Sequence, residues 1–270
     1  MPIAHPPETL EGWYALHQIF RFNKGKPDAA RLARVARSSA TLLGSAPTAR
    51  KKSAKSAPAP VGWSCFARLI GSTSDLLVIH FRESLDAIGA AQDALSKTEL
   101  GKTVQPVYAF LSVTEAGLYH ITAELARAAE ARGGKVGDAE YTRTLAGRAT
   151  AERESQQVRR RLYPELPENM PYVCFYPMSK RRDASQNWYT LPLDERSRLM
   201  QAHGITGRRY SGKVQQVITG AIGLDAWEWG VTLFARDPLD FKKLVTDMRF
   251  DEVSAKYAEF GDFYVGKVVR

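Results

Sequence analysis

Residues 63–81, WSCFARLIGSTSDLLVIHF, decide the fold, because they contain two apolar runs separated by a turn signal. The runs at 63–70 and 75–81 are short and rich in aromatic and aliphatic residues, which is typical of β-strands. The Gly-Ser-Thr-Ser segment between them favours a turn. We therefore expect two consecutive strands at this point of the chain.

The flanking segments extend these two strands into a known order of elements. Residues 12–22 (GWYALHQIFRF) predict a strand, and residues 28–43 carry apolar side chains at helical spacing. Ser84 is expected to cap a helix that turns Leu85, Ile88, Ala91 and Leu95 inward. Residues 105–113 predict a further strand. The resulting order, β-α-β-β-α-β, is the ferredoxin-like arrangement.

The second half of the chain repeats this order without repeating the residues. We expect a strand at 172–176, a helix at 194–203 that is capped by Gly204, and strands at 214–218 and 227–234. A second helix should begin with Asp237 as its N-cap and Pro238 as its first residue, and a final strand should follow at 258–269. The predicted fold class is therefore α+β, with two ferredoxin-like β-α-β-β-α-β units forming a dimeric α+β barrel.

Composition suggests how these units are connected. Residues 1–121 are expected to form the first unit. Within it, residues 44–60 (GSAPTARKKSAKSAPAP) have too few large apolar side chains to form ordered structure, and they predict a flexible linker or loop. Residues 122–160 are rich in Ala, Arg and Glu and predict a connector with one or two surface helices, broken at Gly133-Gly134. Residues 161–270 are expected to form the second unit.

Charge and cysteine content narrow the classes of function. The 38 Lys and Arg against 29 Asp and Glu give a net charge of +9. This charge either indicates an anionic partner, such as nucleic acid or an acidic small molecule, or reflects only solubility and the basic segment at 44–60. No apolar run is long enough to predict a membrane span, and Met1 to Glu11 lack the apolar core of a secretory signal. Cys65 and Cys174 predict two buried thiols in a reducing, cytoplasmic setting.

Two side chains in the second half could carry chemistry, although each also has a structural interpretation. His203 shares a helix face with Leu199 and Met200, so it is either a buried core histidine or a ligand. Tyr176 ends a strand and precedes Met178, Lys180 and two arginines, so its phenol is either a core residue or a group beside cations. Neither residue alone decides between these interpretations.

Several motifs occur together in one order: RRRLYPELP, YVCFYPMSKRR, NWYTLPLDER, LMQAHGITGR, VQQVITG, LDAWEWGVTLFA and DPLDFKKLVTDMRFDEVSAKYAEFGDFYVG. In this combination the chain resembles the coproheme decarboxylase branch of the chlorite dismutase family. The first half resembles the family more loosely, at EGWYALHQIFRF and KTELGKTVQPVYAFLSV.

The resemblance implies an enzyme that binds iron coproporphyrin III (coproheme), whose propionates would explain a cationic pocket. It would use hydrogen peroxide to remove two propionate carboxyls as carbon dioxide, leaving vinyl groups and thus haem b. The resemblance also implies a homopentamer, with a possible transient contact with coproporphyrin ferrochelatase.

The same resemblance assigns roles to individual residues. His203 of the HG motif would be the axial iron ligand, and Tyr176 of the YPMSK motif would be the catalytic radical residue. The remaining substrate-binding residues would be Arg161, Lys180 and Ser254 for propionates, Met178 lining the pocket and Gln216 on the distal face.

Residue chemistry agrees with these roles and leaves two alternatives. A phenol with a pKa of about 10 is neutral at neutral pH, so its loss of an electron is coupled to loss of a proton. No arginine lies between Val214 and Gly223, which disfavours chlorite chemistry, because chlorite dismutases carry a distal arginine. A general haem peroxidase remains an alternative. A nucleic-acid-binding module that stacks bases on Tyr172, Phe175, Trp227 and Trp229 is a weaker one, since no RNP-like motif is present.

Overall fold

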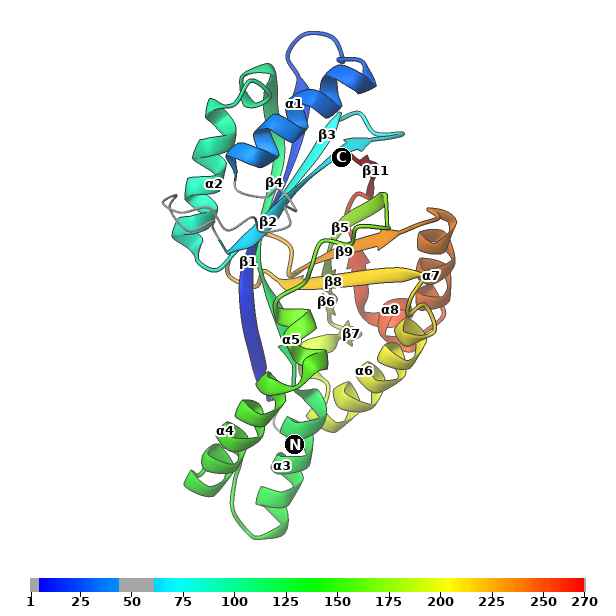
Figure 1. Ribbon diagram of the computed structural model, residues 1–270. Coiled ribbons are helices and arrows are strands. Elements are labelled where there is room, and N and C mark those ends of the chain that lie inside the picture. Colours follow the sequence, from blue (N-terminus) through cyan, green and yellow to red (C-terminus); the bar gives the residue numbers. More distant parts are fainter. Residues whose placement is uncertain (1–4, 44–60, 270) are drawn as a thin grey trace.

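The computed structural model describes residues 5–43 and 61–269 (Figure 1), so the predicted linker at 44–60 lies outside the described residues. The first half contains the four strands β1 (Thr9–Phe22), β2 (Gly62–Leu69), β3 (Leu76–Arg82) and β4 (Val104–Gly117), with the helices α1 (Ala29–Leu42) and α2 (Leu85–Lys97) and the short 3-10 turn η1 (Gly101–Thr103). The strands lie in the order β2-β3-β1-β4. Ser84 caps α2 as predicted, accepting the Ala87 N–H.

The second half has the same arrangement. Its elements are β5 (Tyr172–Lys180), the hairpin β6 (Arg182–Asp183) and β7 (Gln186–Asn187), η2 (Trp188–Thr190), α6 (Leu193–Arg208), β8 (Val214–Gly220), β9 (Trp229–Ala235), α7 (Leu239–Arg249), α8 (Glu252–Tyr257), β10 (Ala258–Phe260) and β11 (Tyr264–Val268). The long strands lie in the order β11-β5-β9-β8, which corresponds element by element to β4-β1-β3-β2. Both halves are therefore ferredoxin-like, as predicted.

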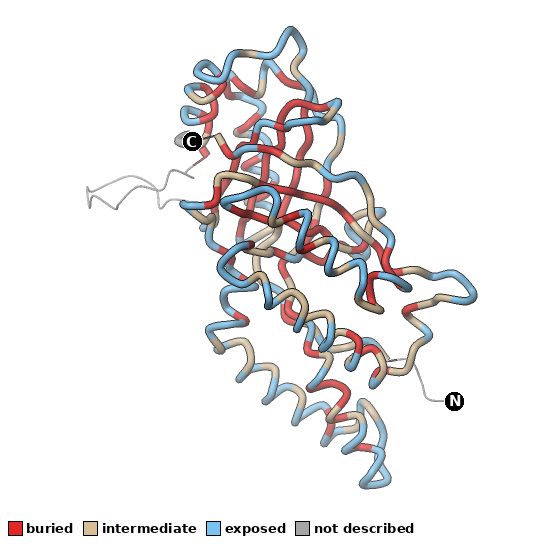
Figure 2. The backbone as a smooth tube through the Cα atoms, turned by 90° about the vertical axis from the view of Figure 1, so that its right-hand side faces the viewer, coloured by how far each residue is buried: buried red, intermediate tan, exposed pale blue. Residues whose placement is uncertain are grey.

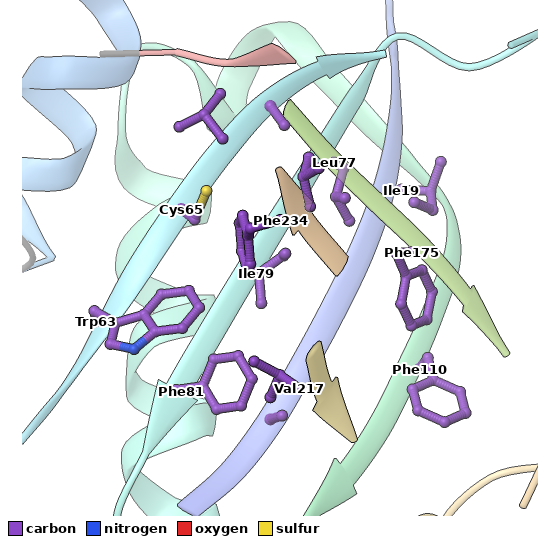
Figure 3. Packing of buried hydrophobic residues seen from close by; sticks show 14 of the residues in the cluster. Ile19, Trp63, Cys65, Leu77, Ile79, Phe81, Phe110, Phe175, Val217 and Phe234 are labelled. Atoms are coloured by element: carbon purple, nitrogen blue, oxygen red, sulfur yellow. The ribbon is translucent and has the colours of Figure 1, made fainter. Parts of the chain in front are cut away.

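The two half-sheets join into one closed antiparallel barrel. Val113 and Thr114 of β4 pair with Gly220 and Thr219 of β8, and β2 pairs with β11 at the opposite seam. Because side chains alternate along a strand, one face of every strand fills the barrel interior. Figure 3 shows Ile19, Phe81, Phe110 and Phe175 among the side chains that gather there. Figure 2 shows the buried residues concentrated in the strands and exposed residues along the helices.

Helices cover the outer faces of the barrel and form the connector (Figure 1). The connector consists of three helices, α3 (Tyr119–Ala131), α4 (Ala139–Glu154) and α5 (Gln156–Leu162), where one or two were expected. The helical structure is interrupted between α3 and α4 at Gly133, whose φ of 77° is a conformation that glycine adopts readily. These helices share their own apolar cluster with the ends of β1 and β4. Within the described residues no helix is long and apolar enough to cross a membrane.

Several predicted boundaries were wrong. Strand β5 does not end at Tyr176 but continues to Lys180, and β4 continues past Val113 to Gly117. Helix α6 continues through Gly204 to Arg208, because its backbone hydrogen bonds do not stop at that glycine. The last strand is two strands, β10 and β11, which both pair with β5, and residues 252–257 form the unpredicted helix α8. Pro238 is itself the N-cap of α7, and Asp237 accepts the Leu239 N–H.

Candidate functional site

A cavity of about 1060 Å³ lies between the outer face of the second half-sheet and helices α6, α7 and α8. This volume is slightly above the usual range of small-molecule sites, about 300–1,000 Å³. All the residues singled out in the sequence line this one cavity: Arg161, Tyr176, Met178, Lys180, His203, Gln216 and Ser254. Tertiary structure therefore brings together side chains from α5, β5, α6, β8 and α8.

Strand β5 supplies the tyrosine side of the cavity. Its alternation turns Phe175 into the barrel, whereas Tyr176, Met178 and Lys180 face outward into the cavity. The Tyr176 ring is buried and stacks on Phe263, with 4.3 Å between ring centroids. Burial, with a smaller contribution from Cys174, raises the pKa of Tyr176 well above its usual value, so the phenol is neutral at every physiological pH.

His203 lies in the middle of α6 and is held by a carboxylate that the sequence analysis missed. Its Nδ1 is 2.9 Å from Oδ2 of Asp251, which also caps α8 by accepting the Ser254 N–H on Oδ1. Burial opposes ionisation of Asp251, but the hydrogen bonds from His203 and Ser254 hold its pKa below the usual value. An ionised carboxylate only accepts, so Nδ1 donates to Asp251, and in the neutral form of the ring the lone pair is on Nε2. In the sequence, Asp251 followed by Glu-Val-Ser is typical of a helix N-cap, and this pattern could have drawn attention to Asp251.

Lys180 is buried at the end of β5 on an aromatic support. Its Nζ lies 4.5 Å from the centroid of the Trp188 ring, and its backbone N–H donates to Glu228 Oε2 at 2.7 Å. Burial lowers the pKa of Lys180 to about 8, although Asp251 and Glu228 oppose this shift. Trp188 and Glu228 had not been singled out in the sequence.

Unpaired cations line the opposite part of the cavity. Burial and the neighbouring Arg208 lower the pKa of Arg161, so the two guanidinium groups lie close enough to repel each other. Neither group has a carboxylate partner among the described residues. This arrangement would be stabilised by an anionic ligand.

Gln216 lies on the sheet wall of the cavity. Its Nε2 donates to the carbonyl oxygen of Gly207 in α6 at 3.3 Å. Cross-strand pairing places Gln216 in the same row as Leu233 and Cys174, one row away from Val231 and Tyr176. On this face the cavity is lined from three paired strands, by Tyr176 on β5, Val231 on β9 and Gln216 on β8.

Comparison with known proteins agrees with this geometry. The family model described as chlorite dismutase matches residues 49–269. A coproheme decarboxylase from Staphylococcus saprophyticus is 38% identical over 100% of this chain and 96% of the relative. A second coproheme decarboxylase, from Staphylococcus carnosus, is 36% identical over 97% of this chain and 94% of that protein.

Solved structures give the same result. A heme-binding protein from Thermus thermophilus has a TM-score of 0.74 and 36% identity, covering 99% of this chain and 95% of that one. A chlorite dismutase from Candidatus Nitrospira defluvii has a TM-score of 0.62 at 18% identity, covering 96% and 91%, which shows the shared fold alone. The extent of the family match and the identity over the full chain together show that this chain belongs to the chlorite dismutase family.

Proposed function

We propose that the chain is a coproheme decarboxylase, which converts two propionates of iron coproporphyrin III to vinyl groups with hydrogen peroxide and so makes haem b. One observation carries the proposal: a single cavity holds a carboxylate-bound histidine, a buried tyrosine and a set of unpaired cations. The two Staphylococcus relatives that bear the name coproheme decarboxylase, at 38% and 36% identity, support the same activity.

The chain's residues fit an iron porphyrin. The free Nε2 of His203 would bind the iron, and Asp251 would hold the ring and its tautomer, as outer-shell carboxylates do for metal-bound histidines. Lys180, Ser254 and Arg161 would bind propionates, because charge-assisted hydrogen bonds to carboxylates are strong in a desolvated pocket. Met178 would line the pocket, and Gln216 would lie on the distal face.

The overall reaction requires a hydrogen acceptor and one proton for each propionate. In balanced form, –CH2CH2COO⁻ + H2O2 + H⁺ gives –CH=CH2 + CO2 + 2 H2O. The bound iron porphyrin supplies the oxidising chemistry with peroxide. Tyr176, after its neutral buried phenol has lost an electron and a proton together, would take a hydrogen atom from the β-carbon of a propionate. Loss of a second electron from that propionate to the oxidant, with release of CO2, would leave the vinyl group. Lys180, two residues beyond Met178 on the same strand face, would hold that propionate in place.

As part of this proposal, the enzyme works in the cytoplasm as a homopentamer and makes a transient contact with a coproporphyrin ferrochelatase. Cys65 and Cys174 are both buried thiols, which supports a reducing compartment. A size measurement by light scattering tests the pentamer; a monomer would contradict it.

Product analysis tests the activity against its alternatives. Ferric coproheme is added to the protein, peroxide is titrated in, and the porphyrin is followed by mass spectrometry. We expect a three-propionate intermediate followed by haem b. A general haem peroxidase would oxidise a dye and leave coproheme intact, whereas a nucleic-acid-binding module would leave the coproheme absorbance spectrum unchanged on mixing. Phe175, one of the aromatics considered for base stacking, is fully buried in the barrel.

A further inference from the structure

Glu115 is the only acidic side chain among the described residues that line the cavity. The cationic residues on the same lining are Arg160, Arg161, Lys180, Arg196, Arg208 and Arg249. A ligand with several carboxylates binds more tightly for each cation that lines the cavity and more weakly for each carboxylate that lines it. The position of Glu115 therefore calls for a physical reason.

The fold gives the Glu115 carboxyl a defined position. The indole Nε1–H of Trp229 donates to Oε1 at 2.8 Å, and Gly220 leaves the space that Oε2 occupies. A Cβ at position 220 would lie 2.2 Å from Oε2, so any other residue there would displace the carboxyl. No ion pair joins Glu115 to a cation in the part of the chain that the structure describes.

The Glu115 carboxyl occupies a different part of the cavity wall from Tyr176 and Lys180. The wall runs through the strands β5, β9, β8 and β4, with Met178 paired to Trp229, Trp229 to Gly220, and Gly220 to Val113. Glu115 belongs to β4, but its carboxyl lies over Gly220 of β8 and contacts Trp229 of β9. Two strand spacings of about 4.8 Å, or roughly 10 Å, separate β8 from β5. The carboxyl and the β5 residues Tyr176 and Lys180 therefore face different edges of a flat ligand that covers the wall.

The surroundings of Glu115 disfavour further negative charge. Burial, and the cross-strand neighbour Glu11, raise the pKa of Glu115 even though Trp229 donates a hydrogen bond to it. A propionate placed beside Glu115 would meet the same desolvation and a second carboxyl group. This corner of the cavity should therefore accept an apolar edge of the ligand and reject a carboxylate.

Coproporphyrin III has one edge that meets this requirement. One of its methine bridges has a methyl group on each side. Every other bridge is flanked by at least one propionate. The isomer coproporphyrin I has a propionate beside every bridge. It therefore has no edge that could face Glu115 without bringing two carboxyl groups together.

We propose that Glu115 is a specificity-determining residue that orients the porphyrin, by admitting only the methyl-flanked edge of coproheme III to the β4 side of the cavity. The inference rests on the proposed function and deepens it, since it names the isomer that the site selects. Orientation matters for the reaction because it decides which propionates lie beside Tyr176 and Lys180 on β5.

Binding of the two isomers tests the proposal without turnover. Ferric coproheme III and ferric coproheme I are titrated separately into the full chain, and each Kd is taken from the absorbance change. We expect the wild-type protein to prefer isomer III by about tenfold or more. The isosteric E115Q variant keeps an acceptor for Trp229 but loses the charge, and should bind both isomers within about twofold, mainly because isomer I binds more tightly.

Matched variants separate the charge from other effects. E115D keeps a carboxylate in the cavity, and E11Q removes the same charge from the paired strand outside the cavity lining, so both should keep the preference for isomer III. E115A provides a second charge-free variant if E115Q does not fold. Equal binding of the isomers by the wild-type protein, or an unchanged preference in E115Q and E115A, would overturn the inference. Conversion of coproheme III to haem b by the wild-type protein tests the proposed function separately.

Discussion

The imidazole of His203 and the carboxylate of Asp251 lie 2.9 Å apart, although the two residues are 48 positions apart in the chain. His203 is in the middle of α6, and Asp251 is the N-cap of α8. The same carboxylate therefore fixes the histidine ring and the start of a helix. This double role couples the proposed iron ligand to the local fold, and it makes Asp251 a suitable position for a first test.

Replacing Asp251 with Asn should weaken coproheme binding by about tenfold or more, because the amide holds the ring less strongly and makes Nε2 a poorer donor. The reduction potential of the bound iron should rise for the same reason. Absorbance titration and spectroelectrochemistry check both results. Glu252→Gln is the matched control, since Glu252 pairs with Lys256 and Arg198 rather than with His203. Equal shifts in both variants would contradict a specific role for Asp251.

Replacing Tyr176 with Phe should leave coproheme binding within about twofold and abolish haem b formation. The aromatic ring that stacks on Phe263 is kept, and only the oxidisable hydroxyl is lost. Porphyrin mass spectrometry after peroxide addition measures the outcome. Tyr172→Phe, on the same strand but off the cavity lining, should retain activity. Full turnover by Tyr176→Phe would remove this tyrosine from the mechanism.

Coproheme affinity should fall as the pH rises above about 8, because the Lys180 ammonium of the free protein loses its proton near that pH. A bound propionate favours the charged form, so binding takes up a proton, and the Kd should rise by up to about tenfold per pH unit. Titrations from pH 7 to pH 10 measure this slope. In Lys180→Arg the guanidinium stays charged, and this component of the slope should disappear. An identical slope in the variant would assign it to another group.

The protein should lose stability as the pH falls below about 6.5, because His17 and His80 are fully buried and neutral, with pKa values of about 3 that burial imposes. Between these pH values the unfolded chain binds more protons than the folded one, so acid favours unfolding by up to about 1.4 kcal/mol per pH unit for each histidine.

Urea unfolding at pH 6, 5 and 4 measures this slope. His17→Gln should reduce it by about one proton's contribution, since glutamine does not titrate. His120→Gln is the control, because the His120 side chain is 79% exposed. An unchanged slope in His17→Gln would show that His17 does not titrate on unfolding.

Local sequence predicted most of the elements. Strand alternation and turn signals located the strands of both halves, and the N-cap at Ser84 was correct. Boundaries that depend on the fold were not predictable. Glycine often ends a helix, yet α6 continues beyond Gly204. Residues 258–269 have the pattern of one strand, yet Gly261 to Phe263 divide them into two. In both places contacts with other elements outweigh the local preference.

The sequence by itself determined the order of elements, the strand that carries Tyr176, and the family resemblance. Only the tertiary structure brought Asp251 to His203, Trp188 beneath Lys180, and Glu115 to Trp229 and Gly220. The physical reason is that alternation and helical spacing are set by neighbours along the chain. Pairs between distant segments depend on sheet register and on the closure of the barrel, which no local pattern contains.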